Sequence, residues 1–320
     1  MEIKMFNLAY FIALICSIGG FVGLYYFLKN KSEKFKKIFL LSFLLFGLAL
    51  HFLKAFIPPY STDVNRWYRD AWFINICAAN IFLFPFIFIS KSDKLKDYMF
   101  YIGLLSGLIS IFYPMEPMDK VNQTAEWLDV VRFYIHHDML WYVPLLMVLF
   151  KIHTLSYKRV LSVPVCLLGV MLFIMLNQIF QSELGFVPLR GGEDAFFEIG
   201  YKNTSLIWGP GDHDFAVIFT ALCPKIFKTV PVGTFAGQEK YLPWFWLIVP
   251  CFVYIVPIAF LICLIFDYKN FKNDFKNLNS KVKNKIALMR RKKNKKNNEQ
   301  QQENFQKIDE IQQCKTSDKL

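Results

Sequence analysis

The sequence of 320 residues is poor in charge and in cysteine. Only 19% of its residues are charged, whereas 55% are hydrophobic and 35 are phenylalanine. So much apolar surface has to be buried, which excludes disorder for most of the chain. The seven cysteines are few, odd in number and placed mostly inside apolar runs, which excludes a disulfide scaffold.

What the sequence has in place of charge is a series of long apolar runs. A helix needs about 20 apolar residues to cross a hydrocarbon core of about 30 Å. Seven runs approach or exceed this length, at 6–28, 38–57, 71–90, 98–113, 130–152, 160–180 and 244–266. The first is too long for the apolar region of a signal peptide and lacks a small-residue cleavage site, so we expect an anchor. The expected fold is all-α, a bundle of seven transmembrane helices in the cell membrane.

The basic residues are distributed unevenly between these runs. A net charge of +12 would suit nucleic acid, but most of the 37 Lys and Arg lie at 29–37, 91–97, 151–159 and in the tail from 267. These segments fall on one side of the membrane, and cytoplasmic loops are enriched in Lys and Arg. We therefore expect the N-terminus outside, the C-terminus inside and no nucleic-acid partner.

The same pattern predicts a transmembrane domain at 1–266 and a basic cytoplasmic tail at 267–320. The tail is expected to be disordered or a surface helix, attracted to anionic lipid headgroups. The outer loop 181–243 is long for an unstructured connection, so we expect it to fold over the outer opening. Its apolar stretch 215–230 is short and is interrupted by Pro224 and Lys225, which predicts an interfacial or re-entrant segment.

Polar side chains inside the apolar runs are few and gather at one depth. At 1.5 Å per residue, His51, Cys77 and His137 lie about 9–10 Å below the outer ends of their predicted helices. The other polar residues in this outer third include Asn75, Asn80, Arg132, His136 and Asn177. Because such groups are costly in hydrocarbon, their common depth predicts a wet cavity open to the outer side. The alternative is that some of them, Arg132 among them, extend to lipid headgroups.

A cysteine and a histidine at matched depth suggest a nucleophile and its base. The thiolate is the reactive form of cysteine, and a neighbouring imidazole can shuttle its proton. Asn75, Asn80 or Asn177 could orient the histidine or stabilise an oxyanion. This set suits acyl transfer through a thioester without a cofactor, with membrane lipids as the substrates. His136 and His137 point about 100° apart on one helix, and the sequence does not say which one faces the cavity.

Three other interpretations stay open at this point. Cys77 can be a small packing residue. A carrier for a polar or anionic solute would use Arg132 and the histidines, although no inverted repeat is visible. A membrane assembly factor would need no chemistry. A metal is not expected, because the candidate ligands His51, His136, His137 and Asp212-His213-Asp214 show neither HExxH nor CxxC spacing.

Three short motifs carry a resemblance to a known family. They are Trp72-Phe73-Ile74-Asn75-Ile76-Cys77, then Val131-Arg132-Phe133-Tyr134-Ile135-His136-His137, and finally Leu176-Asn177. Over about 38–180, and less clearly the last run, the chain resembles the YwaF-like family, which includes the animal transmembrane protein 164. The resemblance implies a lipid acyltransferase with Cys77 as nucleophile, His137 as the matching histidine and Asn177 as the later asparagine. The sequence departs from the family in having Asn75 where a histidine precedes the cysteine.

Overall fold

The computed structural model describes residues 3–57, 60–62, 72–114, 127–184, 205–210, 216–233 and 235–317. Most of these residues are helical, and the described part of the chain contains no β-strand beyond an isolated bridge between Thr229 and Glu239. The all-α prediction is therefore confirmed. The chain divides into two compact units, Met1–Cys263 and Leu264–Leu320, and each is described by itself.

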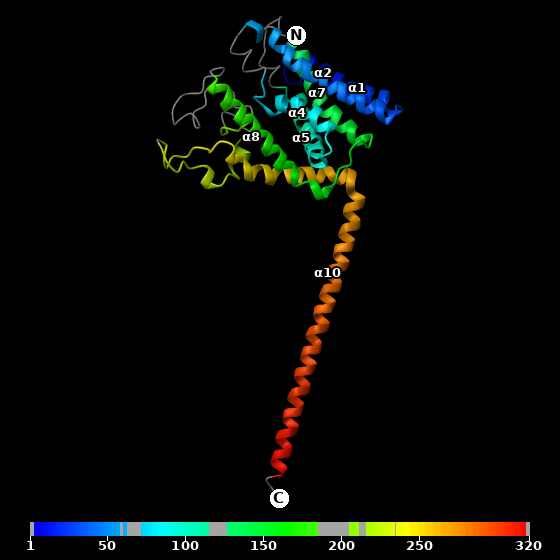
Figure 1. Cartoon of the computed structure of the whole chain (residues 1–320), viewed down its shortest axis with the longest axis vertical. Helices are drawn as coiled ribbons and strands as arrows, with labels where there is room; N and C mark the ends of the chain where they lie inside the picture. Colours follow the sequence, from blue (N-terminus) through cyan, green and yellow to red (C-terminus); the bar gives the residue numbers. More distant parts are fainter. Residues whose placement is uncertain are drawn as a thin grey trace. The chain divides into compact units, whose positions relative to one another are not determined.

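Seven long helices fall on the seven apolar runs. They are α1 (Leu8–Lys29), α2 (Glu33–Leu53), α4 (Ile76–Ile89), α5 (Asp93–Phe112), α7 (Trp127–Leu149), α8 (Ser162–Glu183) and α10 (Ile248–Ser317) (Figure 1). Serine and asparagine side chains begin several of them. Asn7, Ser32 and Ser92 each accept a hydrogen bond from a backbone N–H in the first turn of α1, α2 and α5. These caps set the starts of the helices at their loop ends.

Five helices of the described residues are long and apolar enough to cross a membrane. They are α1, α2 with its short extension to Phe56, α5, α8 and the first part of α10. Helix α4 has 14 residues, or about 21 Å, which is shorter than the hydrocarbon core. Helix α7 has 23 residues but contains Asp129, Arg132 and Asp138. The prediction that the third helix starts at residue 71 is wrong, because α4 begins only at Ile76.

Helix α5 lies at the centre of the first unit and packs against α4, α7 and α8 (Figure 1). Two glycines permit its close approach to α7. A Cβ atom at Gly103 would lie 2.5 Å from the carbonyl oxygen of Leu140, and one at Gly107 would lie 2.8 Å from that of His137. Since no side chain fits there, the α5–α7 contact depends on these two glycines.

The described parts of the outer loop form short elements. Helix α9 (Ala216–Thr220) and a 3₁₀ turn at Lys225–Phe227 lie within the apolar stretch 215–230, and neither is long enough to cross a membrane. The segment 205–210 is held by tryptophans. Trp246 donates to the Leu206 carbonyl at 2.9 Å, and Trp208 donates to Gln178 Oε1 on α8 at 2.6 Å. This part of the loop is therefore tied to α8 and to the segment just before α10.

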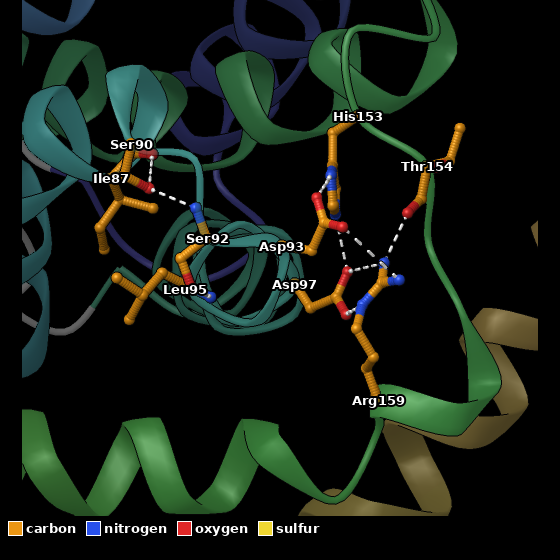
Figure 2. Close-up of polar contacts among 9 residues, drawn as sticks. All are labelled: Ile87, Ser90, Ser92, Asp93, Leu95, Asp97, His153, Thr154 and Arg159. Atoms are coloured by element: carbon orange, nitrogen blue, oxygen red, sulfur yellow. Dashed lines mark hydrogen bonds and ion pairs between the residues drawn. The ribbon is translucent and has the colours of Figure 1, made fainter.

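A buried ion-pair cluster joins the start of α5 to the connection between α7 and α8. Asp97, which is 1% exposed, accepts hydrogen bonds from His153 Nε2 at 2.7 Å and from Arg159 Nε at 2.6 Å (Figure 2). Arg159 also donates to the Thr154 carbonyl at 2.6 Å. The hydrogen bond to Asp97 raises the pKa of the Arg159 guanidinium. We call Asp97, His153 and Arg159 the Asp97 cluster.

The second unit, taken alone, is helical through Ser317. Of the two states expected for the tail, the structure contains the helix. Its residues 281–290 are all exposed, and they include Lys281, Lys283, Lys285 and Arg290. At Asp267 the backbone leaves the helical region, and the carboxylate accepts a hydrogen bond from Asn270 Nδ2 at 2.7 Å.

Candidate functional site

Cys77 lies in the first turn of α4. The residue before this helix, Asn75, is extended and accepts a hydrogen bond from the Ala78 N–H at 2.7 Å, as an N-cap does. The Ile76 N–H donates to Ser205 Oγ at 3.1 Å. Cys77 is therefore not 9 Å below a helix end, because the helix itself starts later. The positive end of a helix dipole favours an anion at such a position.

His136 links α7 to this turn. Its Nε2–H donates to the carbonyl oxygen of Cys77 at 3.2 Å. Its ring centroid lies 5.6 Å from that of His51 on α2 and 5.1 Å from that of His137. All three histidines are buried. The structure thus brings the rings of His51, His136 and His137 together, and His136 contacts the backbone of Cys77.

His137 has a defined tautomer. Its Nδ1 is 2.8 Å from the Phe133 carbonyl oxygen, which can only accept, so Nδ1 carries the proton. The lone pair is then on Nε2, as in a general base oriented by its other nitrogen. Helix α5 lies against both groups, since Gly107 faces the His137 carbonyl and Ser110 Oγ lies 4.0 Å from Cys77 Sγ. The pairing of Cys77 with His137 stays a prediction.

Two of the asparagines have structural contacts. Asn75 is the N-cap of α4, and this role uses its Oδ1. Asn80 is fully buried and its Oδ1 accepts a hydrogen bond from the Tyr98 hydroxyl at 2.6 Å. Its Nδ2 is buried and has no hydrogen-bond partner among the described residues. Asn80 therefore fastens α4 to α5 and retains an unused donor within that part of the chain.

Arg132 lies in a second polar cluster. Its Nε donates to Asp129 Oδ1 at 2.6 Å, and the Tyr60 hydroxyl donates to the other oxygen at 3.1 Å. The Lys54 ammonium lies 5.5 Å from the centre of the Tyr60 ring. Asp129 is three residues before Arg132, a spacing that could have indicated the pair from the sequence. Arg132 is buried and paired with a carboxylate.

Asn177 is half-buried on α8, and its Nδ2 has no hydrogen-bond partner in the described part of the chain. Its neighbour Gln178 donates to the Ile74 carbonyl at 3.3 Å and accepts from Trp208. Gln178 therefore ties α8 to the segment before α4. The sequence analysis missed Ser110, in an apolar run, and Ser205, in the outer loop, because a lone hydroxyl has no distinctive spacing.

The remaining candidate ligands and thiols do not form a second centre in the described residues. None of Cys16, Cys77, Cys166, Cys223, Cys251 and Cys263 forms a disulfide bond. Burial raises the pKa of Cys223 in the outer loop. No group of three His, Cys, Asp or Glu suited to a metal ion occurs among the described residues. The predicted alternative at Asp212-His213-Asp214 lies outside them.

An all-helical first unit with several membrane-length apolar helices defines a membrane protein. The sequence profile of the TMEM164 family matches residues 4–266, which is most of the chain. The chain therefore belongs to the TMEM164 family, and the resemblance seen in its motifs is confirmed. The comparison with curated proteins and the comparison with solved structures each found no match.

Proposed function

We propose that this chain is a lipid acyltransferase or esterase of the cell membrane, with Cys77 as nucleophile and His137 as base. The observation that supports this proposal is the position of Cys77. It lies in the first turn of α4, and His136, one of three clustered buried histidines, donates to its carbonyl oxygen. A cysteine at a helix start with imidazoles on the neighbouring helices is a setting that favours nucleophilic chemistry.

The proposed reaction has two balanced steps. His137 Nε2 takes the proton of the Cys77 thiol, and the thiolate attacks the ester carbonyl of a lipid. A thioester forms, the ester C–O bond breaks, and the leaving alkoxide receives the proton from His137. An alcohol, or water for an esterase, then attacks the thioester while His137 accepts its proton and returns it to the sulfur. The site of attack would be in the outer third of the bilayer.

The proposed topology follows the charge distribution. All seven long helices cross the membrane, with the N-terminus outside and the C-terminus inside, as the excess of Lys and Arg at 29–37, 91–97 and 151–159 favours. The short α4 completes its crossing with the residues that precede it, 72–75. The basic tail from 267 lies at the cytoplasmic surface and contacts anionic headgroups.

The alternatives of a carrier and of an assembly factor gain no support. A carrier of anions needs a cation aimed at its substrate, whereas Arg132 is paired with Asp129 at 2.6 Å. Arg132→Ala separates the two functions, because it would abolish transport by a carrier but leave the first step of acyl transfer in place.

The decisive experiment uses the purified full-length protein in lipid nanodiscs with a phospholipid that carries a radiolabelled acyl chain. The wild type should retain label in a hydroxylamine-sensitive thioester and should transfer it to an acceptor lipid. Cys77→Ser should lose both signals while keeping its thermal transition. Cys16→Ser is the matched control, because Cys16 is exposed on α1 and should not matter. Full transfer activity in Cys77→Ser would refute the nucleophile.

A further inference from the structure

An open hollow of about 350 Å³ is lined by residues from α2, α4 and α5 and by Ile152. It lies at the C-terminal end of α4, whereas Cys77 lies at the N-terminal end of that helix. Its lining on α2 is Lys37, Ile38 and Leu41. Its lining on α4 is Phe88 and Ile89, the last two residues of that helix before its cap. The volume is at the lower end of the range for small-ligand sites.

Lys96 on α5 and Ile152 after α7 complete the lining. Two ammonium groups from different helices therefore border a surface that is otherwise apolar. Ile38 is 55% exposed and Ile89 is 63% exposed, so the hollow opens sideways onto the outer surface of the bundle. In a membrane this surface faces lipid, and an acyl chain can reach the apolar lining from the bilayer.

The Asp97 cluster supports two members of this lining. Lys96 and Ile152 are the chain neighbours of Asp97 and His153, which are 1% and 4% exposed and hydrogen-bonded to each other at 2.7 Å (Figure 2). The backbone at both positions is consequently fixed by a buried contact. The hollow is thus a built feature of the fold and does not depend on loose surface loops.

We propose that this hollow binds one anionic phospholipid, whose phosphate lies between Lys37 and Lys96 and whose acyl chain lies along Ile38, Leu41 and Ile89. Charge complementarity identifies the occupant, since paired cations above an apolar groove at the membrane boundary match a phosphate above an acyl chain. The site is separate from Cys77 and involves no chemistry. It stands whether or not the proposed acyl transfer does.

The ion pair of Lys37 with Glu33, at 2.5 Å, does not oppose this assignment. Both side chains are largely exposed, and an exposed pair one helical turn apart is weak and readily exchanged. Lys36 has other contacts, because it donates to the Lys29 carbonyl and lies 4.5 Å from the centre of the Phe150 ring. Lys37 and Lys96, the two lysines that line the hollow, are therefore the proposed ligands of the phosphate.

Native mass spectrometry of the full-length protein in detergent, titrated with phosphatidylglycerol or phosphatidylcholine, tests the proposal. The wild type should retain one phosphatidylglycerol more tightly than phosphatidylcholine. Lys37→Gln with Lys96→Gln should weaken phosphatidylglycerol binding roughly thirtyfold, from two charges near a headgroup. Phosphatidylcholine binding should change little. Ile38→Trp keeps both charges but fills the hollow, and it should weaken both lipids.

The matched control is Lys34→Gln with Lys91→Gln. It removes the same charge from two exposed lysines outside the hollow, Lys34 in the first turn of α2 and Lys91 just before α5. This control should bind phosphatidylglycerol within about twofold of the wild type. An equal loss in both double variants would overturn the site in favour of a diffuse basic surface. Competition by glycerol 3-phosphate as strong as by phosphatidylglycerol would overturn the lipid, because the acyl chain would then contribute nothing.

Discussion

The Asp97 cluster and the polar residues of α4 and α8 differ in how many of their buried polar atoms have hydrogen-bond partners. At the Asp97 cluster, both carboxylate oxygens accept hydrogen bonds from His153 or Arg159. On α4 and α8, by contrast, Asn80 Nδ2, Asn177 Nδ2 and both polar atoms of Gln181 are buried without a hydrogen-bond partner among the described residues. A satisfied network stabilises a fold, whereas unsatisfied groups are costly and are kept where a ligand or water can use them. The comparison assigns a stabilising role to the Asp97 cluster, whereas the proposed reaction places function at Cys77.

The largest expected effect is on the end that contains Cys77. His137→Ala should lower the rate of lipid acyl transfer about 10²–10⁴-fold, because a positioned general base contributes that much. The thermal transition should move little. Single-turnover transfer of a labelled acyl chain in nanodiscs measures the rate. A normal rate in this variant, together with an inactive His136→Ala variant, would show that His136 is the general base and His137 is not.

The Asp97 cluster should show the converse, a loss of stability with little change in chemistry. Asp97→Ala leaves a buried His153 and a partly buried Arg159 without their carboxylate, which should cost about 3–5 kcal/mol. Thermal denaturation in detergent measures the change. Asp93→Ala is the matched control. Asp93 is 61% exposed and its carboxylate is 3.9 Å from Arg159 Nη1, a weak ion pair, so its loss should cost less than about 1 kcal/mol. Similar losses in both variants would contradict the assignment.

The glycine contact between α5 and α7 lies between these two ends. Gly107→Ala should destabilise the bundle by about 1–3 kcal/mol, because its Cβ would press on the His137 carbonyl. It should also lower acyl transfer by moving the imidazole. Gly169→Ala on α8 meets nothing within 4 Å, so it should be neutral or slightly stabilising. Chemical denaturation and transfer rates, taken on both variants, separate these outcomes.

The smallest effect should come from the cap of α4. Asn75→Ala removes the acceptor of the Ala78 N–H and should cost about 1 kcal/mol of stability. Asn75→Asp keeps a capping oxygen and should stay close to the wild type. If Asn75→Asp abolishes acyl transfer without a change in the thermal transition, Asn75 acts on the substrate and not only as a cap.

Much of this architecture could be predicted from the apolar runs. The start of the helix in the run 71–90 was nevertheless predicted too early. Asn75 was interpreted as a buried polar group inside the helix, whereas it is the N-cap. Arg132 pairs with Asp129, a partner that the sequence analysis did not name. Both contacts join residues three positions apart, and the hydropathy of a run does not reveal such partners.

The sequence by itself determined that the chain is all-helical and that its helices suit a membrane, because apolar runs of membrane length have few other folds. Its motifs resemble the TMEM164 family, and the family profile over residues 4–266 shows the membership. Only the tertiary structure decided which polar groups meet. His51, His136 and the backbone of Cys77 come from three helices, and Asp97 and Arg159 are 62 residues apart. Such contacts depend on helix rotation and on the close α5–α7 approach at Gly103 and Gly107, which packing sets and hydropathy does not encode.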